Sequence, residues 1–180
     1  MPPGISILDA SGPGPEESSG LVARVAESFG LPVRHRFQRF DLERFYEPAR
    51  GQHDATALLL HVASLTRDPG EKLIAVVDVD LFIPVLTFVF GQAQLGGNAA
   101  VVSSHRLANE FYGLPQDARV FHERIEKEVV HELGHLFGLY HCNQFECVMR
   151  SSTYVEELDL KRAAFCEECA GKLVVATRAA

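Results

Sequence analysis

The sequence lacks the excess of positive charge that a protein needs to bind nucleic acid or an anionic membrane surface. Its 180 residues contain 17 lysines and arginines against 24 aspartates and glutamates, a formal net charge of −7. It also lacks a long hydrophobic run, because two aspartates and a proline interrupt the most apolar stretch, residues 73–91. A membrane-spanning helix needs about 20 consecutive apolar residues. We therefore expect no nucleic-acid partner and no membrane insertion.

The first three quarters of the chain also contain no cysteine, and its beginning shows no basic segment followed by an apolar run, as a secretory signal would. We therefore expect a cytoplasmic protein whose cysteines serve metal or redox chemistry. The length and the hydrophobic fraction of 47% predict one domain over residues 1–180. The sequence does not fix the oligomeric state, and a monomer is the simpler expectation.

The hydrophobic pattern predicts an α+β fold, a mixed five-stranded twisted sheet with helices packed on it. The predicted strands are residues 5–8, 33–40, 73–77, 85–90 and 98–103, and the glycine-rich residues 91–97 are predicted to be a loop. The predicted helices cover about residues 21–29, 54–65 and 121–138, and a fourth begins at Thr153. Asp54 is the expected N-cap of the second helix, and Thr153 and Glu156 would form a capping box.

A histidine motif lies on the third predicted helix. His131 and His135 are four positions apart and therefore lie on one helix face, where both can bind one zinc ion. Gly138 can adopt the left-handed conformation that turns the chain and returns His141 as a third ligand. Three histidines leave a fourth coordination position open to water, as in catalytic zinc sites. Glu132 would be the general base that takes a proton from this water.

Two other interpretations of the motif must be weighed. A lone histidine on an apolar helix face is more often a hydrogen-bonded core residue than a ligand, and we keep that interpretation for His61. The three histidines coincide with an acid and a turn glycine, which favours the zinc site. A zinc-containing module that binds peptides without cleaving them is the alternative function, although such a module has no need of Glu132.

The cysteines form two closely spaced pairs. They are Cys142 and Cys147, and Cys166 and Cys169, with eighteen residues between the pairs. Both spacings are typical of cysteine-bound zinc, so four thiolates would close a second, structural site. Two disulfides, a redox pair or four unlinked thiols remain the alternatives. Because His141 and Cys142 are neighbours, the second zinc would brace the backbone that carries the third histidine.

The segment from His131 to His141 resembles the extended zinc signature of the metzincin metallopeptidases. Its continuation through Met149 and the four cysteines resembles that of the archaemetzincins, over residues 131–169 in all. The resemblance implies a zinc metallopeptidase with a peptide or protein substrate and two zinc ions per chain. It further implies that Met149 packs beneath the three histidines, in a turn that this family shares.

The resemblance also implies an N-terminal subdomain of about residues 1–138 and a small C-terminal subdomain of about residues 139–180, which would hold the cysteine-bound zinc. In such a fold an extended peptide pairs with the edge strand of the sheet. Residues 85–90 are the candidate for that strand, with an ordinary core strand as the alternative.

Overall fold

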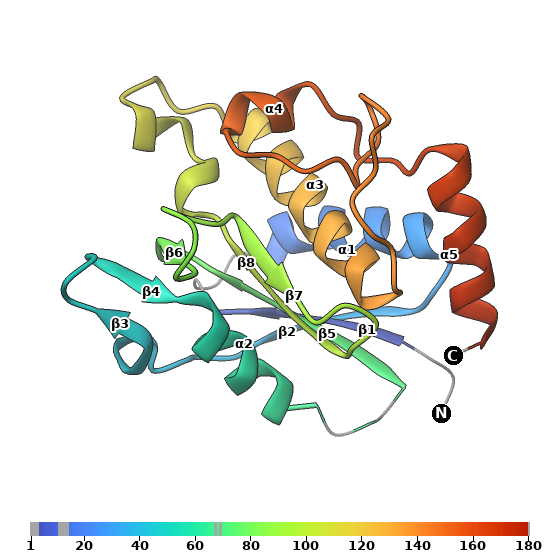
Figure 1. Ribbon diagram of the computed structural model, residues 1–180, viewed down its shortest axis with the longest axis horizontal. Helices are drawn as coiled ribbons and strands as arrows, with labels where there is room; N and C mark the ends of the chain where they lie inside the picture. Colours follow the sequence, from blue (N-terminus) through green and yellow to red (C-terminus); the bar gives the residue numbers. More distant parts are fainter. Residues whose placement is uncertain (1–3, 11–14, 67, 69, 180) are drawn as a thin grey trace.

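The computed structural model describes residues 4–10, 15–66, 68 and 70–179 (Figure 1). The strands are β1 (Gly4–Asp9), β2 (Val33–Phe37), β3 (Tyr46–Glu47), β4 (Gln52–Asp54), β5 (Glu71–Val77), β6 (Leu81–Phe82), β7 (Gly91–Ala93) and β8 (Ala99–Ser103). The α-helices are α1 (Pro15–Phe29), α2 (Ala55–Ser64), α3 (Ala118–Leu136), α4 (Val155–Asp159) and α5 (Glu167–Ala179). Short 3-10 helices are η1 (Leu42–Phe45), η2 (His105–Leu107) and η3 (Asn109–Tyr112).

Within the described residues, five strands form the main sheet in the order β2-β1-β5-β8-β7. The first four are parallel to one another, whereas β7 is antiparallel to β8 and forms one edge. This confirms the predicted mixed five-stranded sheet. A smaller sheet with the order β3-β4-β6 was not predicted.

Strand β5 illustrates how the alternation of side chains builds two cores. Ile74 and Val76 join the core with residues of α1, α3 and α5, whereas Leu73, Ala75 and Val77 join the core beneath α2. Figure 1 shows α1 and α3 on one face of the sheet and α2 on the other. Burial on both faces explains why this segment is uniformly apolar rather than alternating. Among the described residues, no helix combines the length and apolar character needed to cross a membrane.

The start of α2 matches its prediction in detail. The Asp54 carboxylate accepts the backbone N–H groups of Thr56 at 2.8 Å and Ala57 at 3.0 Å. These donors have no partner within the helix, so the side chain satisfies them as an N-cap does.

The prediction of a strand at residues 85–90 is wrong. Residues 83–90 form a loop in which the side chains of Val85 and Leu86 are 83% and 52% exposed, so the segment is neither a sheet edge nor an ordinary core strand. The edge strand is β7, inside the stretch predicted to be a loop. Most of the apolar side chains of residues 83–90 line a cleft, and the rings of Phe88 and Phe90 pack on one another. The segment therefore has a strand-like sequence, although it pairs only through a single antiparallel bridge between Val89 and Leu81.

Several element boundaries also differ from the prediction, since α1 begins at Pro15 and α3 spans Ala118–Leu136. β2 ends at Phe37 rather than residue 40. α4 begins after Tyr154, and Glu157 rather than Glu156 accepts the backbone N–H of Tyr154 at 3.2 Å, so the expected Thr153–Glu156 capping box is shifted by one residue. Helix α5 begins after Cys166 and was not separated from α4 by the sequence pattern.

Candidate active site

Helix α3 carries two of the three motif histidines and the glutamate between them. The ring centroids of His131, His135 and His141 are 4.7 to 5.3 Å apart, and their candidate ligand nitrogens all lie within 4.8 Å of one another. The three predicted ligands are therefore brought together, two by the helical repeat and one by the chain that returns after the helix.

Hydrogen bonds orient the two helical histidines. The Nδ1 atom of His131 lies 2.8 Å from the Val148 carbonyl oxygen, and that of His135 lies 2.7 Å from the Leu139 carbonyl oxygen. A carbonyl only accepts, so each Nδ1 carries the proton and each neutral ring presents a bare Nε2.

These two bare Nε2 atoms face one another at 3.2 Å. Lone pairs in such an arrangement repel unless a cation lies between them. Tetrahedral zinc with ordinary zinc–nitrogen bonds would separate two nitrogen ligands by about 3.3 Å. The donor set and its spacing therefore fit zinc.

The environment of the three histidines favours the neutral form of their rings, which is the form that binds metal. Burial lowers the pKa of His131 well below its ordinary value, and the positive charge of Lys161 acts in the same direction. Burial likewise lowers the pKa values of His135 and His141.

The turn after α3 depends on Gly138, whose φ of 82° lies in the left-handed region that favours glycine. The N–H of Gly138 bonds the His135 carbonyl at 2.9 Å, and that of Leu139 bonds the Gly134 carbonyl at 3.0 Å, as in a Schellman motif. The same turn places the Leu139 carbonyl against His135. Gly138 thus ends the helix and supplies the acceptor that orients a candidate ligand.

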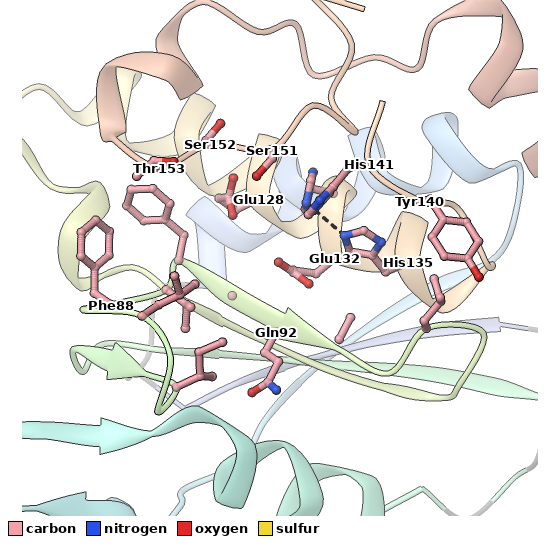
Figure 2. A pocket seen from close by; sticks show the side chains of 18 of the residues that line it. Phe88, Gln92, Glu128, Glu132, His135, Tyr140, His141, Ser151, Ser152 and Thr153 are labelled. Atoms are coloured by element: carbon pink, nitrogen blue, oxygen red, sulfur yellow. Dashed lines mark hydrogen bonds between the residues drawn. The ribbon is translucent and has the colours of Figure 1, made fainter. Parts of the chain in front are cut away.

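Glu132 lies beside the histidines in a cleft of about 550 Å³ (Figure 2). Burial raises the pKa of Glu132 well above its ordinary value, and the nearby Glu128 adds to the rise. Strand β7 approaches the side chain closely, because a Cβ at Gly91 would lie 2.7 Å from Oε1 of Glu132 and 2.8 Å from the Val101 carbonyl oxygen. Gly91 could not be predicted from the sequence, since its role depends on a contact between distant segments.

Met149 is fully buried and packs against α3 at Gly134. A Cβ at Gly134 would collide with the Met149 sulfur and would lie 3.3 Å from the Phe165 ring. The glycine of the histidine motif therefore leaves room for the methionine to pack directly on the helix backbone.

The four cysteines also form one cluster, and all four are free thiols. Their sulfur atoms lie within 4.8 Å of one another, and those of Cys142 and Cys166 are 3.7 Å apart. Tetrahedral zinc would separate two sulfur ligands by about 3.8 Å, far beyond a disulfide bond. The backbone N–H of Cys169 bonds the Cys166 sulfur and lowers the pKa of that thiol, whereas burial raises the pKa values of Cys147 and Cys169.

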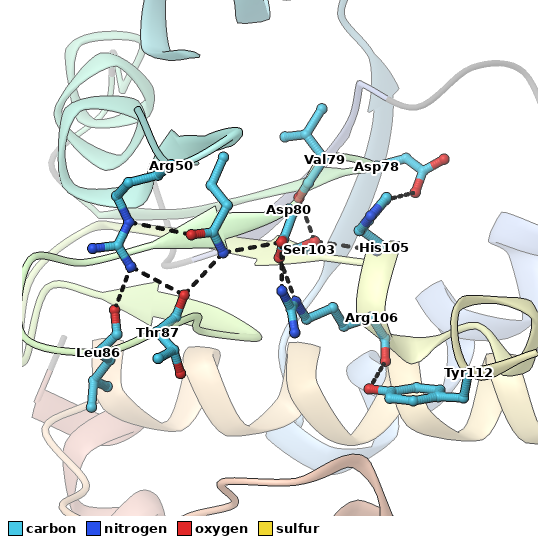
Figure 3. A network of polar contacts seen from close by, with 11 residues as sticks. Arg50, Asp78, Val79, Asp80, Leu86, Thr87, Ser103, His105, Arg106 and Tyr112 are labelled. Carbon is cyan, nitrogen blue, oxygen red and sulfur yellow. Dashed lines mark hydrogen bonds and ion pairs between the residues drawn. The ribbon is translucent and has the colours of Figure 1, made fainter. Parts of the chain in front are cut away.

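A polar network fastens the loop of residues 83–90 along the cleft (Figure 3). Arg50 donates to the carbonyl oxygens of Leu86 at 2.9 Å and Thr87 at 3.2 Å, and Gln52 donates to that of Thr87 at 2.9 Å. Gln52 also binds Asp80, which forms a two-point ion pair with Arg106 at 2.6 and 2.7 Å. Arg50 lies between β3 and β4, and Gln52 lies on β4. The small sheet β3-β4-β6 therefore supports the part of the cleft wall that residues 83–90 form.

The sequence model of peptidase family M54 matches residues 20–174. The chain belongs to this family. Its relatives include the archaemetzincin of Pyrococcus abyssi, 45% identical over 164 residues that cover 86% of this chain and 82% of the relative. The archaemetzincin of Pyrococcus horikoshii is 39% identical over 145 residues, which cover 80% of this chain and 74% of the relative.

Solved structures agree with this M54 assignment. A zinc-dependent peptidase from Methanocorpusculum labreanum superposes with a TM-score of 0.87 at 34% identity, covering 94% of this chain and all of that one. The archaemetzincin of Methanopyrus kandleri gives a TM-score of 0.84 at 34% identity, covering 98% of this chain and 96% of that one. The predicted archaemetzincin relationship is confirmed, and the chain is a zinc metallopeptidase that acts on peptides or proteins.

Proposed function

We propose that this M54 peptidase hydrolyses peptide bonds with His131, His135 and His141 as the ligands of a catalytic zinc and Glu132 as the general base. The facing Nε2 atoms of His131 and His135, 3.2 Å apart beside Glu132, carry this proposal. When bound there, zinc would polarise the substrate carbonyl and lower the pKa of the attacking water.

Glu132 is suited to moving the proton. Burial and Glu128 raise its pKa, so its carboxylate is a stronger base than one in water. Glu132 takes a proton from the attacking water and delivers it to the nitrogen of the departing amine. Gly91 supports this role by letting β7 approach without displacing the carboxylate.

The substrate would lie extended beside β7, whose outer edge has no strand partner among the described residues. Its backbone groups can pair with a peptide, as in strand addition to a sheet edge. The cleft is lined by residues of the 83–95 segment and of α3, which precede residue 138, and by residues 140, 141 and 151–153, which follow it. This arrangement supports a division near residue 138 into an N-terminal and a small C-terminal subdomain, with the cleft between them.

The four cysteines would hold a second, structural zinc, which makes two zinc ions per chain. Support comes from the clustered free thiols and from their 3.7 Å sulfur separation. The backbone N–H of Cys142 bonds the Met149 carbonyl at 2.9 Å, so this site lies against the turn beneath the histidines.

Metal analysis combined with peptide turnover tests the proposed function. We expect about two zinc ions per chain and cleavage of a fluorogenic peptide library that stops with a chelator and returns with zinc. Two bound zinc ions and tight peptide binding without turnover would show that the protein binds peptides but does not cleave them. Failure to bind zinc would contradict both functions.

Gly91→Ala should lower kcat by about 10- to 100-fold, because a misplacement of about 1 Å at a catalytic group can cost that much. The added methyl would meet Glu132 and the fixed Val101 carbonyl at less than 3 Å. Steady-state kinetics and zinc content are the measurements. Gly171→Ala is the control, since a Cβ there meets nothing within 4 Å. Unchanged kcat in Gly91→Ala would contradict this placement of Glu132.

Arg50→Met should raise KM for peptides about threefold to fivefold with little change in kcat, because it loosens a cleft wall without touching the reacting groups. Losing hydrogen bonds from a charged donor at an exposed position is worth about 1 kcal/mol. Arg44→Met, in η1 outside this network, is the control. A decrease in kcat with unchanged KM would show instead that the loop of residues 83–90 affects the chemical step.

A further inference from the structure

Lys161 is a lysine with a fully buried side chain, in the segment after α4. Burial lowers its pKa, and Glu128 acts in the opposite direction. Lysine is rarely buried unless its ammonium group is paired, so its partners indicate its role. No sequence pattern predicts a role for this residue.

The ammonium group holds the turn around Met149. Its Nζ donates to the carbonyl oxygens of Arg150 at 2.8 Å and Val148 at 3.3 Å, the residues on either side of the methionine. Glu128 is its nearest carboxylate, at 3.9 Å, which is beyond hydrogen-bond distance. The backbone carbonyls are therefore its direct partners, and Glu128 compensates its charge.

One of these carbonyls also orients a candidate zinc ligand. The Val148 oxygen accepts the Nδ1–H of His131 at 2.8 Å, so His131 and Lys161 share one acceptor. Two backbone hydrogen bonds hold the same segments together, from Val148 to Ala164 at 3.0 Å and from Arg162 to Glu146 at 2.9 Å. Lys161 therefore connects the chain after α4 to the histidine site.

We propose that Lys161 is a positioning residue of the zinc site: its ammonium group fixes the Val148 carbonyl and thereby the ring of His131. Without it, two buried carbonyls lose a donor and the turn can move, so His131 no longer aims its Nε2 at His135. Removing the hydrogen-bond partner of a metal-binding histidine typically lowers metal affinity 10- to 100-fold. The inference rests on the proposed function, because it takes the three histidines as zinc ligands.

Zinc affinity of the full-length protein, measured by competition with a chelator, tests this role without reference to turnover. Lys161→Met is expected to weaken the histidine site about 10- to 100-fold. The visible spectrum of the cobalt-substituted protein should change for the histidine site, while the sulfur-to-cobalt band of the cysteine site remains. Lys161→Arg, which keeps charge and donors, should restore most of the affinity.

Lys127→Met is the matched control. Lys127 is also a buried lysine, and its Nζ donates to the Leu158 carbonyl at 2.9 Å, away from the Met149 turn. The Lys127→Met protein should unfold at a lower temperature than the parent but bind zinc with the same affinity. Equal zinc affinities in the two methionine variants would overturn the proposal.

Two further variants keep the test decisive. If Lys161→Met does not fold, Lys161→Gln, whose side chain is one atom shorter, should show the same loss, and parent-like affinity would overturn the proposal. Glu128→Gln should retain zinc, and a loss as large as that of Lys161→Met would assign the effect to the ion pair instead. Failure of the proposed function itself looks different, because the parent protein would then bind no zinc through its histidines.

Discussion

Glu132→Gln is expected to lower kcat for peptide hydrolysis by about 10²- to 10⁴-fold while both zinc ions stay bound. The amide has nearly the shape of the carboxylate but cannot accept the proton of the attacking water. Glu132 is buried beside the histidines without being placed as a ligand, so the substitution leaves the three imidazoles in position. The loss should therefore appear in kcat rather than in zinc content.

Steady-state kinetics and metal analysis of the same preparations show whether kcat falls while zinc stays bound. Glu123→Gln makes the same chemical change on the exposed side of α3, where Glu123 pairs with Arg119, and should leave kcat unchanged. Turnover by Glu132→Gln near that of the parent would remove Glu132 as the general base. Loss of zinc together with turnover would make it a structural rather than a chemical residue.

Cys142→Ser is expected to release the zinc of the cysteine cluster and to weaken the histidine site about 10- to 100-fold. Cys142 follows His141 directly, and its N–H bonds the carbonyl of Met149 at 2.9 Å. Removal of one thiolate opens the cluster, and the backbone that carries His141 loses its brace.

Metal content after dialysis against a graded series of chelator concentrations measures this coupling. The matched control is Asn143→Ser, a neighbouring exposed position outside both ligand sets, which should retain two zinc ions. A Cys142→Ser protein with a fully occupied histidine site would show that the two sites are independent.

The features that were predictable depend on short-range patterns. The strand at residues 73–77, the Asp54 cap and the histidine pair on α3 all follow from a fixed spacing along one element. The cysteine cluster follows from two local spacings. In each case, the residues that matter are close in sequence and the physical rule is local.

The features that were missed depend on contacts between distant segments. The role of Gly91 depends on its close contact with Glu132, which lies 41 residues later in the chain. The role of Lys161 depends on its hydrogen bonds to the backbone carbonyls on either side of Met149. The apolar loop of residues 83–90 was mistaken for a strand because an apolar run does not reveal whether it pairs or lines a cleft. Its anchor, Arg50, lies in another part of the chain.

The short length of β7 has a consequence for the behaviour of the protein in concentrated solution. An open sheet edge is a template on which a second molecule can dock and begin an aggregate. Three residues offer at most about 10 Å of backbone, enough to align a few residues of an incoming chain but too little to hold two sheets together. Lengthening this strand by design would therefore favour self-association.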